Sequence, residues 1–194
     1  MNSATKKRKI DPEAKHTAIL NAAMELFSSQ GYAATSIAAI AGKADVAVGT
    51  VHRIFTDKAN VLAAAKTQIE KRLTSTMVLA WQKPGPLETR FQTMLNAIFD
   101  EMIIIHRFMP IMALKVETHG SVEDGHYVRL AIKDFIRAEI SAGNFRQMPI
   151  DHAAEIMFGM VDGATRNAAS GNIHEARLVY VPLLAGMMMR AVAA

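Results

Sequence analysis

The stretch TSIAAIAGKADVAVGTVHRIFTDK, residues 35–58, decides the fold. It contains two short helical patterns separated by a tight turn, which is the arrangement of a helix-turn-helix unit. We expect one helix at residues 36–42, capped by Thr35, and a second at about 46–54, capped by Asp45. The residues expected to face the core are Ile37, Ile40, Ala41, Val46, Val51 and Phe55.

Gly49 lies inside the second of these helices. A glycine in the interior of a helix costs about 1 kcal/mol relative to alanine. A close approach of another surface would explain its presence, and that surface would be DNA or a neighbouring helix.

Helical signals continue on both sides of this stretch, and strand patterns are nearly absent. Upstream, Asp11 and Pro12 predict a helix start and Gly31 predicts its end. Downstream, Asp57 is expected to cap a helix that runs to about Trp81. A long amphipathic helix follows, with its apolar stripe at Phe91, Met94, Leu95, Ile98, Met102 and Ile105.

Three more helices are expected at residues 126–142, 151–169 and 173–192. We expect Asp151 to cap the second of them, and Pro182 to kink the third or delay its start. The predicted fold class is all-α, with about nine helices. The predicted domains are a basic tail at residues 1–10, a helix-turn-helix domain at 11–56 and a helical body at 57–194.

Composition narrows the possible functions. The chain has 194 residues, of which 51% are hydrophobic and none is cysteine. The missing cysteines exclude disulfides, thiolate nucleophiles and Cys-ligated zinc. No apolar run is long enough to span a membrane, and no secretory signal follows the basic N-terminus, so we expect a cytoplasmic protein.

The positive charge gathers near the N-terminus. The formal net charge is +4, and through residue 60 eight Lys and Arg stand against five Asp and Glu, which is +3. This distribution favours an anionic partner for the first third of the chain. A basic tail kept for solubility would give the same balance.

Residues 18–62 resemble the TetR (tetracycline-repressor) family of bacterial transcription regulators. The resemblance rests on ILNAAMELF at 19–27, GYAATSI at 31–37, Ile40-Ala41, Gly49-Thr50-Val51, Phe55 and KANVL at 58–62. It implies a three-helix DNA-binding head on a helical body that binds small molecules and dimerises. It also implies double-stranded operator DNA as the partner.

The resemblance suggests which residues contact DNA. Thr35 and Lys58 stand at expected helix starts, which favour phosphate, and His52 matches a position that is commonly aromatic in the family. Thr50 and Arg53 are polar positions of the second helix, and Ala47 and Val48 could touch thymine methyl groups. The basic run Lys6, Lys7, Arg8 and Lys9 could contact the DNA backbone or minor groove, or be a plain disordered tail.

The chain departs from the family pattern at several of these positions. Ala38 and Ala39 stand where Arg and Asp are frequent, and Ala47 and Val48 stand where Ser-Lys is usual. The head has therefore lost hydroxyl and cationic groups that would meet phosphate. Asp45 replaces a usual glycine, which suggests a shifted cap.

For the body, the resemblance implies a ligand pocket and a dimer surface. The apolar lining candidates are Ile98, Met102, Ile105, Met112, Phe135 and Phe158, with His106, Glu117 and Arg129 as possible polar anchors. The last two helices carry many small and apolar residues, which favour close packing in a homodimer, although packing within a monomer would also use them.

Three classes of function follow. The first is a repressor that binds a palindromic operator as a homodimer and is released by a small, largely apolar effector. The second is a DNA-binding regulator whose body binds a partner protein. The third, an all-helical enzyme, has no motif in its favour. No cofactor or metal is expected, because a solvated loop is the better interpretation of His119, Glu123, Asp124 and His126.

Overall fold

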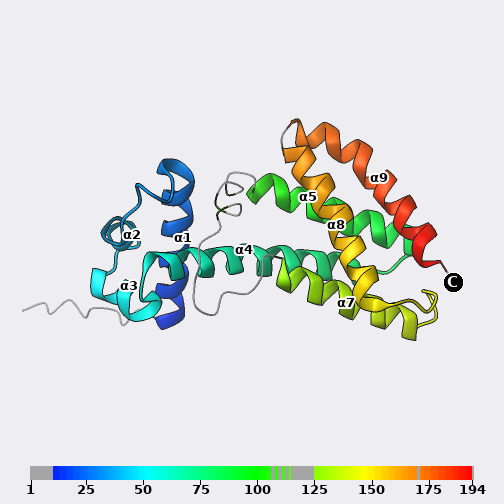
Figure 1. Cartoon of the computed structure of the whole chain (residues 1–194), viewed down its shortest axis with the longest axis horizontal. Helices are drawn as coiled ribbons and strands as arrows, with labels where there is room; N and C mark the ends of the chain where they lie inside the picture. Colours follow the sequence, from blue (N-terminus) through cyan, green and yellow to red (C-terminus); the bar gives the residue numbers. More distant parts are fainter. Residues whose placement is uncertain are drawn as a thin grey trace, which may run out of the picture. The chain divides into compact units, whose positions relative to one another are not determined.

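The computed structural model describes residues 11–105, 108, 111, 114, 125–169 and 171–193, without the side chains of 103–105 and 169. Within these ranges every regular element is an α-helix, which confirms the predicted fold class (Figure 1). The helices are α1 (Pro12–Gln30), α2 (Ile37–Lys43), α3 (Val48–Phe55), α4 (Lys58–Trp81), α5 (Leu87–Ile105), α7 (His126–Ser141), α8 (Ile150–Ala169) and α9 (Ile173–Val192). None of them is long and apolar enough to cross a membrane.

Several helix ends lie where their local signals predict them. The Asp11 carboxylate accepts a hydrogen bond of 3.3 Å from the Glu13 N–H, and Gly31, whose φ is 86°, is the C-cap that directly follows α1. The Asp57 carboxylate accepts one of 2.8 Å from the Asn60 N–H at the start of α4. Gly143, with φ of 76°, follows the end of α7. These ends were predictable because each depends on a cap within a few residues.

Three predicted caps are wrong. Ser36, and not Thr35, caps α2, because its hydroxyl accepts a hydrogen bond of 3.1 Å from the Ala39 N–H. Asp45 does not cap α3, which begins two residues later than predicted, at Val48. Asp151 lies inside the first turn of α8, where its carboxylate pairs with Lys133 at 2.8 Å.

The last helix continues through its proline. The helix α9 extends from Ile173 to Val192 with Pro182 inside it, so its start is not delayed. Its N-cap is Asn172. The Asn172 side-chain oxygen accepts hydrogen bonds from two backbone N–H groups of the first turn, that of His174 at 3.1 Å and that of Glu175 at 3.4 Å.

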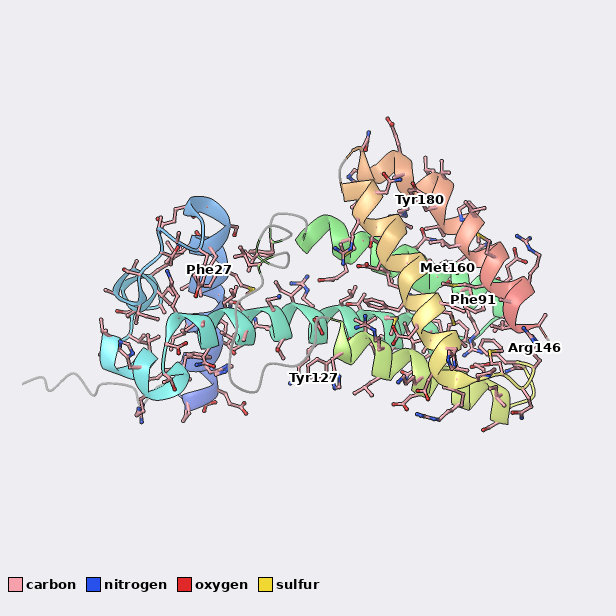
Figure 2. All side chains as sticks on the ribbon, in the orientation of Figure 1. Phe27, Phe91, Tyr127, Arg146, Met160 and Tyr180 are labelled. Carbon is pink, nitrogen blue, oxygen red and sulfur yellow. The ribbon has the colours of Figure 1, made fainter. Side chains whose placement is uncertain are left out.

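The chain divides into two compact units. The first comprises residues 1–67 with 108–121, and the second comprises residues 68–107 with 122–194. The division falls inside α4, which contributes residues to both units. In the first unit, α1, α2 and α3 bury an apolar core that includes Phe27, labelled in Figure 2, with Ile19, Leu20, Ile40, Val51 and Phe55.

The second unit is built around α5. Its predicted apolar stripe is buried at Phe91, Met94, Leu95, Ile98 and Met102, and Figure 2 labels Phe91 within this core. The α5 helix packs against α9, and α8 packs against both α7 and α9. An aromatic cluster joins the Phe91 ring to Trp81 at 5.1 Å, Phe135 at 6.0 Å and Phe145 at 6.1 Å between centroids.

Candidate nucleic-acid interface

The helices α2 and α3 form the predicted helix-turn-helix. Ile40 and Ala41 of α2 are buried, as are Val51 and Phe55 of α3, while Ile37 and Val46 are half-buried. The turn closes by a hydrogen bond of 3.0 Å from the Val46 N–H to the Ala41 carbonyl. Asp45 adopts φ of 52° in this turn, a left-handed conformation that Asp tolerates better than most residues. Aspartate therefore fits this turn position, and the N-cap of α3 is Ala47, two residues further along the chain.

The α3 helix exposes most of its predicted contact residues. Ala47, Val48, His52 and Arg53 are exposed, and Thr50 is half-buried. Ala47 is the N-cap and provides no side-chain hydrogen bond to the first turn. The exposed side of α3 is therefore apolar at its beginning and carries its side-chain hydrogen-bonding groups one turn later.

Gly49 is exposed in the first turn of α3, nearer the helix start than the sequence suggested. A Cβ atom built there would meet no heavy atom within 4 Å. Packing against a neighbouring helix of the described chain therefore does not explain the glycine.

The His52 ring has a fixed orientation. Its Nδ1 lies 2.9 Å from the carbonyl oxygen of Thr56, and because a carbonyl can only accept, Nδ1 carries the proton. In the neutral ring Nε2 is then an acceptor, so a hydrogen bond from Nε2 to phosphate requires the protonated ring.

Thr35 and Lys58, predicted to contact phosphate, are instead engaged within the first unit. Thr35 is buried, and its hydroxyl donates to the Gly31 carbonyl at 2.8 Å. The Lys58 ammonium donates hydrogen bonds of 2.8 Å to the carbonyls of Tyr32 and Thr35, and it lies 4.3 Å from the centroid of the Tyr32 ring. Both side chains hold the α1–α2 connection, a role that sequence reasoning missed because the partners of Lys58 lie more than 20 residues away.

The basic run at residues 6–9 lies outside the described residues. Its predicted contact with DNA therefore stays a prediction. In the described part of the head, Lys43 pairs with Glu25 at 2.7 Å, which ties α2 to α1.

The predicted ligand-lining residues of the body contact different sets of neighbouring side chains. Ile98 and Met102 are buried one turn apart on α5. The Phe135 ring packs against Trp81 at 4.1 Å and belongs to the aromatic cluster. Phe158 instead covers the Arg129 guanidinium at 4.0 Å, and Arg129 lies six positions before Phe135 on α7, which is about 9 Å along the axis.

The remaining body candidates are less informative. The Ile105 side chain, Met112, His106 and Glu117 lie outside the described residues. Arg129, a possible polar anchor, pairs with the Glu155 carboxylate at 3.0 Å. No group of side chains suited to a metal ion occurs among the residues that the structure describes.

Sequence reasoning missed a buried carboxylate in the second unit. Glu139 of α7 is 6% exposed and accepts hydrogen bonds from Trp81 Nε1 at 3.1 Å, Arg90 at 2.8 Å and Asn144 Nδ2 at 2.7 Å. Burial acts to raise the pKa of Glu139, but the hydrogen bonds from Arg90, Asn144 and Trp81 outweigh it, so the pKa is lowered. The available signal was its position seven residues after Ile132 and three after Ile136, on the apolar stripe of α7.

The first unit also carries a match to a known family. Residues 19–65 match the sequence profile of "Bacterial regulatory proteins, tetR family". This segment runs from α1 through the helix-turn-helix into α4. It spans the same part of the chain as the resemblance described above.

A curated relative supports the same family. The "HTH-type transcriptional repressor KstR" of Rhodococcus jostii (strain RHA1) is 40% identical over 82 residues, which is 41% of this chain and 37% of KstR. The matching segment therefore spans just over a third of that repressor's length.

Solved structures resemble the fold over nearly the whole chain. The "fatty acid degradation regulator FadR" of Bacillus halodurans has a TM-score of 0.70 at 18% identity, covering 88% of this chain and 98% of FadR. NalD of Pseudomonas aeruginosa, the "secondary repressor of MexAB-OprM multidrug efflux pump", has a TM-score of 0.63 at 20% identity, covering 94% of this chain and 98% of NalD. At such identities the likeness shows the fold alone. With the helix-turn-helix and the profile match, the conclusion is that residues 19–65 form a head of the type found in the tetR family of bacterial regulatory proteins.

Proposed function

We propose that this protein is a cytoplasmic transcriptional repressor that binds a palindromic operator as a homodimer and is released by a small effector. The observation that carries the DNA-binding part is the exposed first turn of α3 in a tetR-type head, with an open Gly49. The family consists of transcription regulators and not of enzymes, in agreement with the sequence prediction.

The apolar surface of the last two helices supports the homodimer. The exposed large apolar side chains there are Ile156 of α8 and Leu178, Val179, Leu183 and Met187 of α9. Gly159 and Gly163 of α8 are also exposed, and a Cβ at either would meet nothing within 4 Å. Exposed apolar side chains beside small residues suit close helix packing across a two-fold axis. The recognition helices of such a dimer should lie about 34–36 Å apart to enter successive major grooves.

The effector is proposed to bind in the body among apolar side chains that include Ile98 and Met102. The α4 helix contains residues of both units, so the chain that follows the recognition helix continues directly into the body. The effector must bind the DNA-incompetent state more tightly, because equal affinity for both states shifts no equilibrium. A hundredfold release requires about 2.7 kcal/mol of differential binding.

The proposal is tested by fluorescence anisotropy with duplex DNA from beside the protein's own gene, followed by a metabolite screen for release. We expect salt-sensitive, sequence-dependent binding that Arg53→Ala weakens, whereas Arg137→Ala on α7 leaves it unchanged. For the effector, Met102→Trp should block release and spare DNA binding, and Met102→Leu should preserve both. If the effector still releases the Met102→Trp protein from DNA, the effector site lies elsewhere. If no small molecule releases the wild-type protein from DNA, a protein partner becomes the better interpretation.

A further inference from the structure

The first turn of α3 combines exposure with apolar chemistry. The Val48 side chain is 43% exposed, next to exposed Ala47 and Gly49. None of these three side chains can donate or accept a hydrogen bond. At this exposure, the Val48 side chain contributes little to the apolar core of the head.

We propose that Ala47 and Val48 read the C5 methyl group of thymine in each operator half-site, and that Gly49 allows the helix to approach the base edges closely. This inference rests on the proposed DNA-binding function. The residues at the beginning of a recognition helix are those that contact base edges in helix-turn-helix complexes.

The chemistry of the major groove selects thymine. Thymine alone among the four unmodified bases presents a methyl group there, while cytosine presents an amino donor and guanine presents two acceptors. Apolar side chains placed against the edge of a G·C pair would leave those groups desolvated without a partner. The first turn of α3 therefore favours thymine by contact and disfavours G·C pairs by desolvation.

The space around Gly49 fits this interpretation. Gly49 and Arg53 lie one turn apart on the outward side of α3, opposite the buried Val51 and Phe55. Because a Cβ at Gly49 would meet nothing in the described chain, the absence of a side chain leaves room for the DNA. Arg53, also exposed, can then reach phosphate or a base edge one turn further along.

The experiment uses the full chain and a duplex that it selects from a random-sequence library. Each thymine of the selected half-site is replaced in turn by deoxyuridine, which keeps every base-pairing group and removes only the C5 methyl. We expect at least one thymine per half-site whose replacement weakens binding about fourfold, the equivalent of about 0.8 kcal/mol for one buried methyl-sized group. Replacement in both half-sites should weaken binding about 16-fold if the two contributions add.

The variants Val48→Ala and Ala47→Gly, made singly and together, show which residue reads the methyl. The ratio of affinities for thymine and deoxyuridine at that position should fall toward one in the variant that lacks the reading side chain, and in the double variant. The matched control is Val78→Ala, because Val78 of α4 is 37% exposed in the second unit, and it should leave the ratio at about four.

Three results would overturn the inference. The first is wild-type protein that binds all deoxyuridine duplexes as tightly as the thymine duplex, and the second is a full ratio retained when Val48→Ala and Ala47→Gly are combined. In both cases DNA binding itself stands and only the methyl reading fails. If no duplex is selected, the DNA-binding function fails and the methyl reading fails with it.

Discussion

The Lys58 ammonium donates a hydrogen bond of 2.8 Å to the carbonyl oxygen of Tyr32, which lies 26 residues earlier in the chain. Lys58 is the first residue of α4, and Tyr32 lies between α1 and α2. The same ammonium also reaches the Thr35 carbonyl at 2.8 Å, directly before the Ser36 cap of α2. One side chain thus connects the start of α4 to the entry of the helix-turn-helix.

Lys58→Met should therefore destabilise the head. A hydrogen bond from a charged donor contributes about 1.5–3 kcal/mol, and the variant loses such bonds to two carbonyls. Thermal unfolding followed by circular dichroism should show a lower midpoint, with Lys83→Met, an exposed lysine, as the control.

The salt dependence of DNA binding separates this positioning role from a phosphate contact. Each phosphate contact adds about −0.9 to the slope of log affinity against log salt. We expect Lys58→Met to weaken binding to all sequences with an unchanged slope. A slope reduced by about one unit, with normal stability, would show that Lys58 contacts phosphate instead.

Gly49→Ala should have opposite effects on stability and binding. Alanine favours the helix by up to about 1 kcal/mol, and the structure leaves room for its Cβ, so the unfolding midpoint should rise. The added methyl occupies the space proposed for DNA, so affinity for the selected duplex should fall at least several-fold. Both quantities can be measured on one preparation, and a stabilised variant with unchanged affinity would show that DNA does not approach this glycine.

Local signals in the sequence predicted most helices but not their tertiary contacts. The ends at Asp11, Gly31 and Asp57 were predictable because each cap bonds to a nearby backbone group. Asp45 misled the prediction because aspartate also tolerates the left-handed conformation that the turn requires. Asp151 misled it because its carboxylate has an ion-pair partner on another helix.

The exposed residues of the candidate site could be predicted from the sequence, but the internal contacts of Thr35 and Lys58 could not. The family resemblance pointed to Val48, His52 and Arg53, and the structure exposes all three because burying Val51 and Phe55 leaves those positions outward. Spacing could not show that Thr35 is buried or that Lys58 binds carbonyls, since both depend on how the α1–α2 connection folds back on α4.

Leu183→Glu should convert the proposed dimer into monomers. Leu183 is 51% exposed on α9, so a carboxylate there is solvated in the free protomer and buried without a partner in a dimer. Sedimentation should show a dimer for the wild type and a monomer for the variant, with operator affinity reduced at least tenfold. Leu79→Glu, at an exposed leucine of α4, should remain dimeric. A Leu183→Glu protein that stays dimeric would place the interface elsewhere.

Glu139→Gln should destabilise the second unit in a pH-dependent way. The buried carboxylate pairs with Arg90 at 2.8 Å, and removing one partner of a buried ion pair costs about 3–5 kcal/mol. The lowered pKa of Glu139 means that its contribution is fully present above its ordinary pKa of 4.5 and is lost as pH falls through the lowered value. Urea unfolding followed by the fluorescence of Trp81, the one tryptophan in the sequence, should show a wild-type advantage that is constant near neutral pH and shrinks in acid.

The control for this variant is Asp134→Asn. Its partner Arg137 lies one turn away, and both side chains are more than half exposed. Exposed pairs of this kind contribute about 0–1 kcal/mol, so its stability should follow the wild type at every pH. A wild-type advantage over Glu139→Gln that does not change on acidification would show that the carboxylate charge is not what stabilises this cluster.

The mass of the protein–DNA complex tests the central claim most directly. Full-length protein is mixed with its selected duplex, and the complex is weighed by analytical ultracentrifugation. We predict a complex that holds two protomers on one palindromic duplex, and no complex of comparable affinity on a scrambled duplex of the same composition. A single protomer bound with full affinity, or equal binding to the scrambled duplex, would contradict the account.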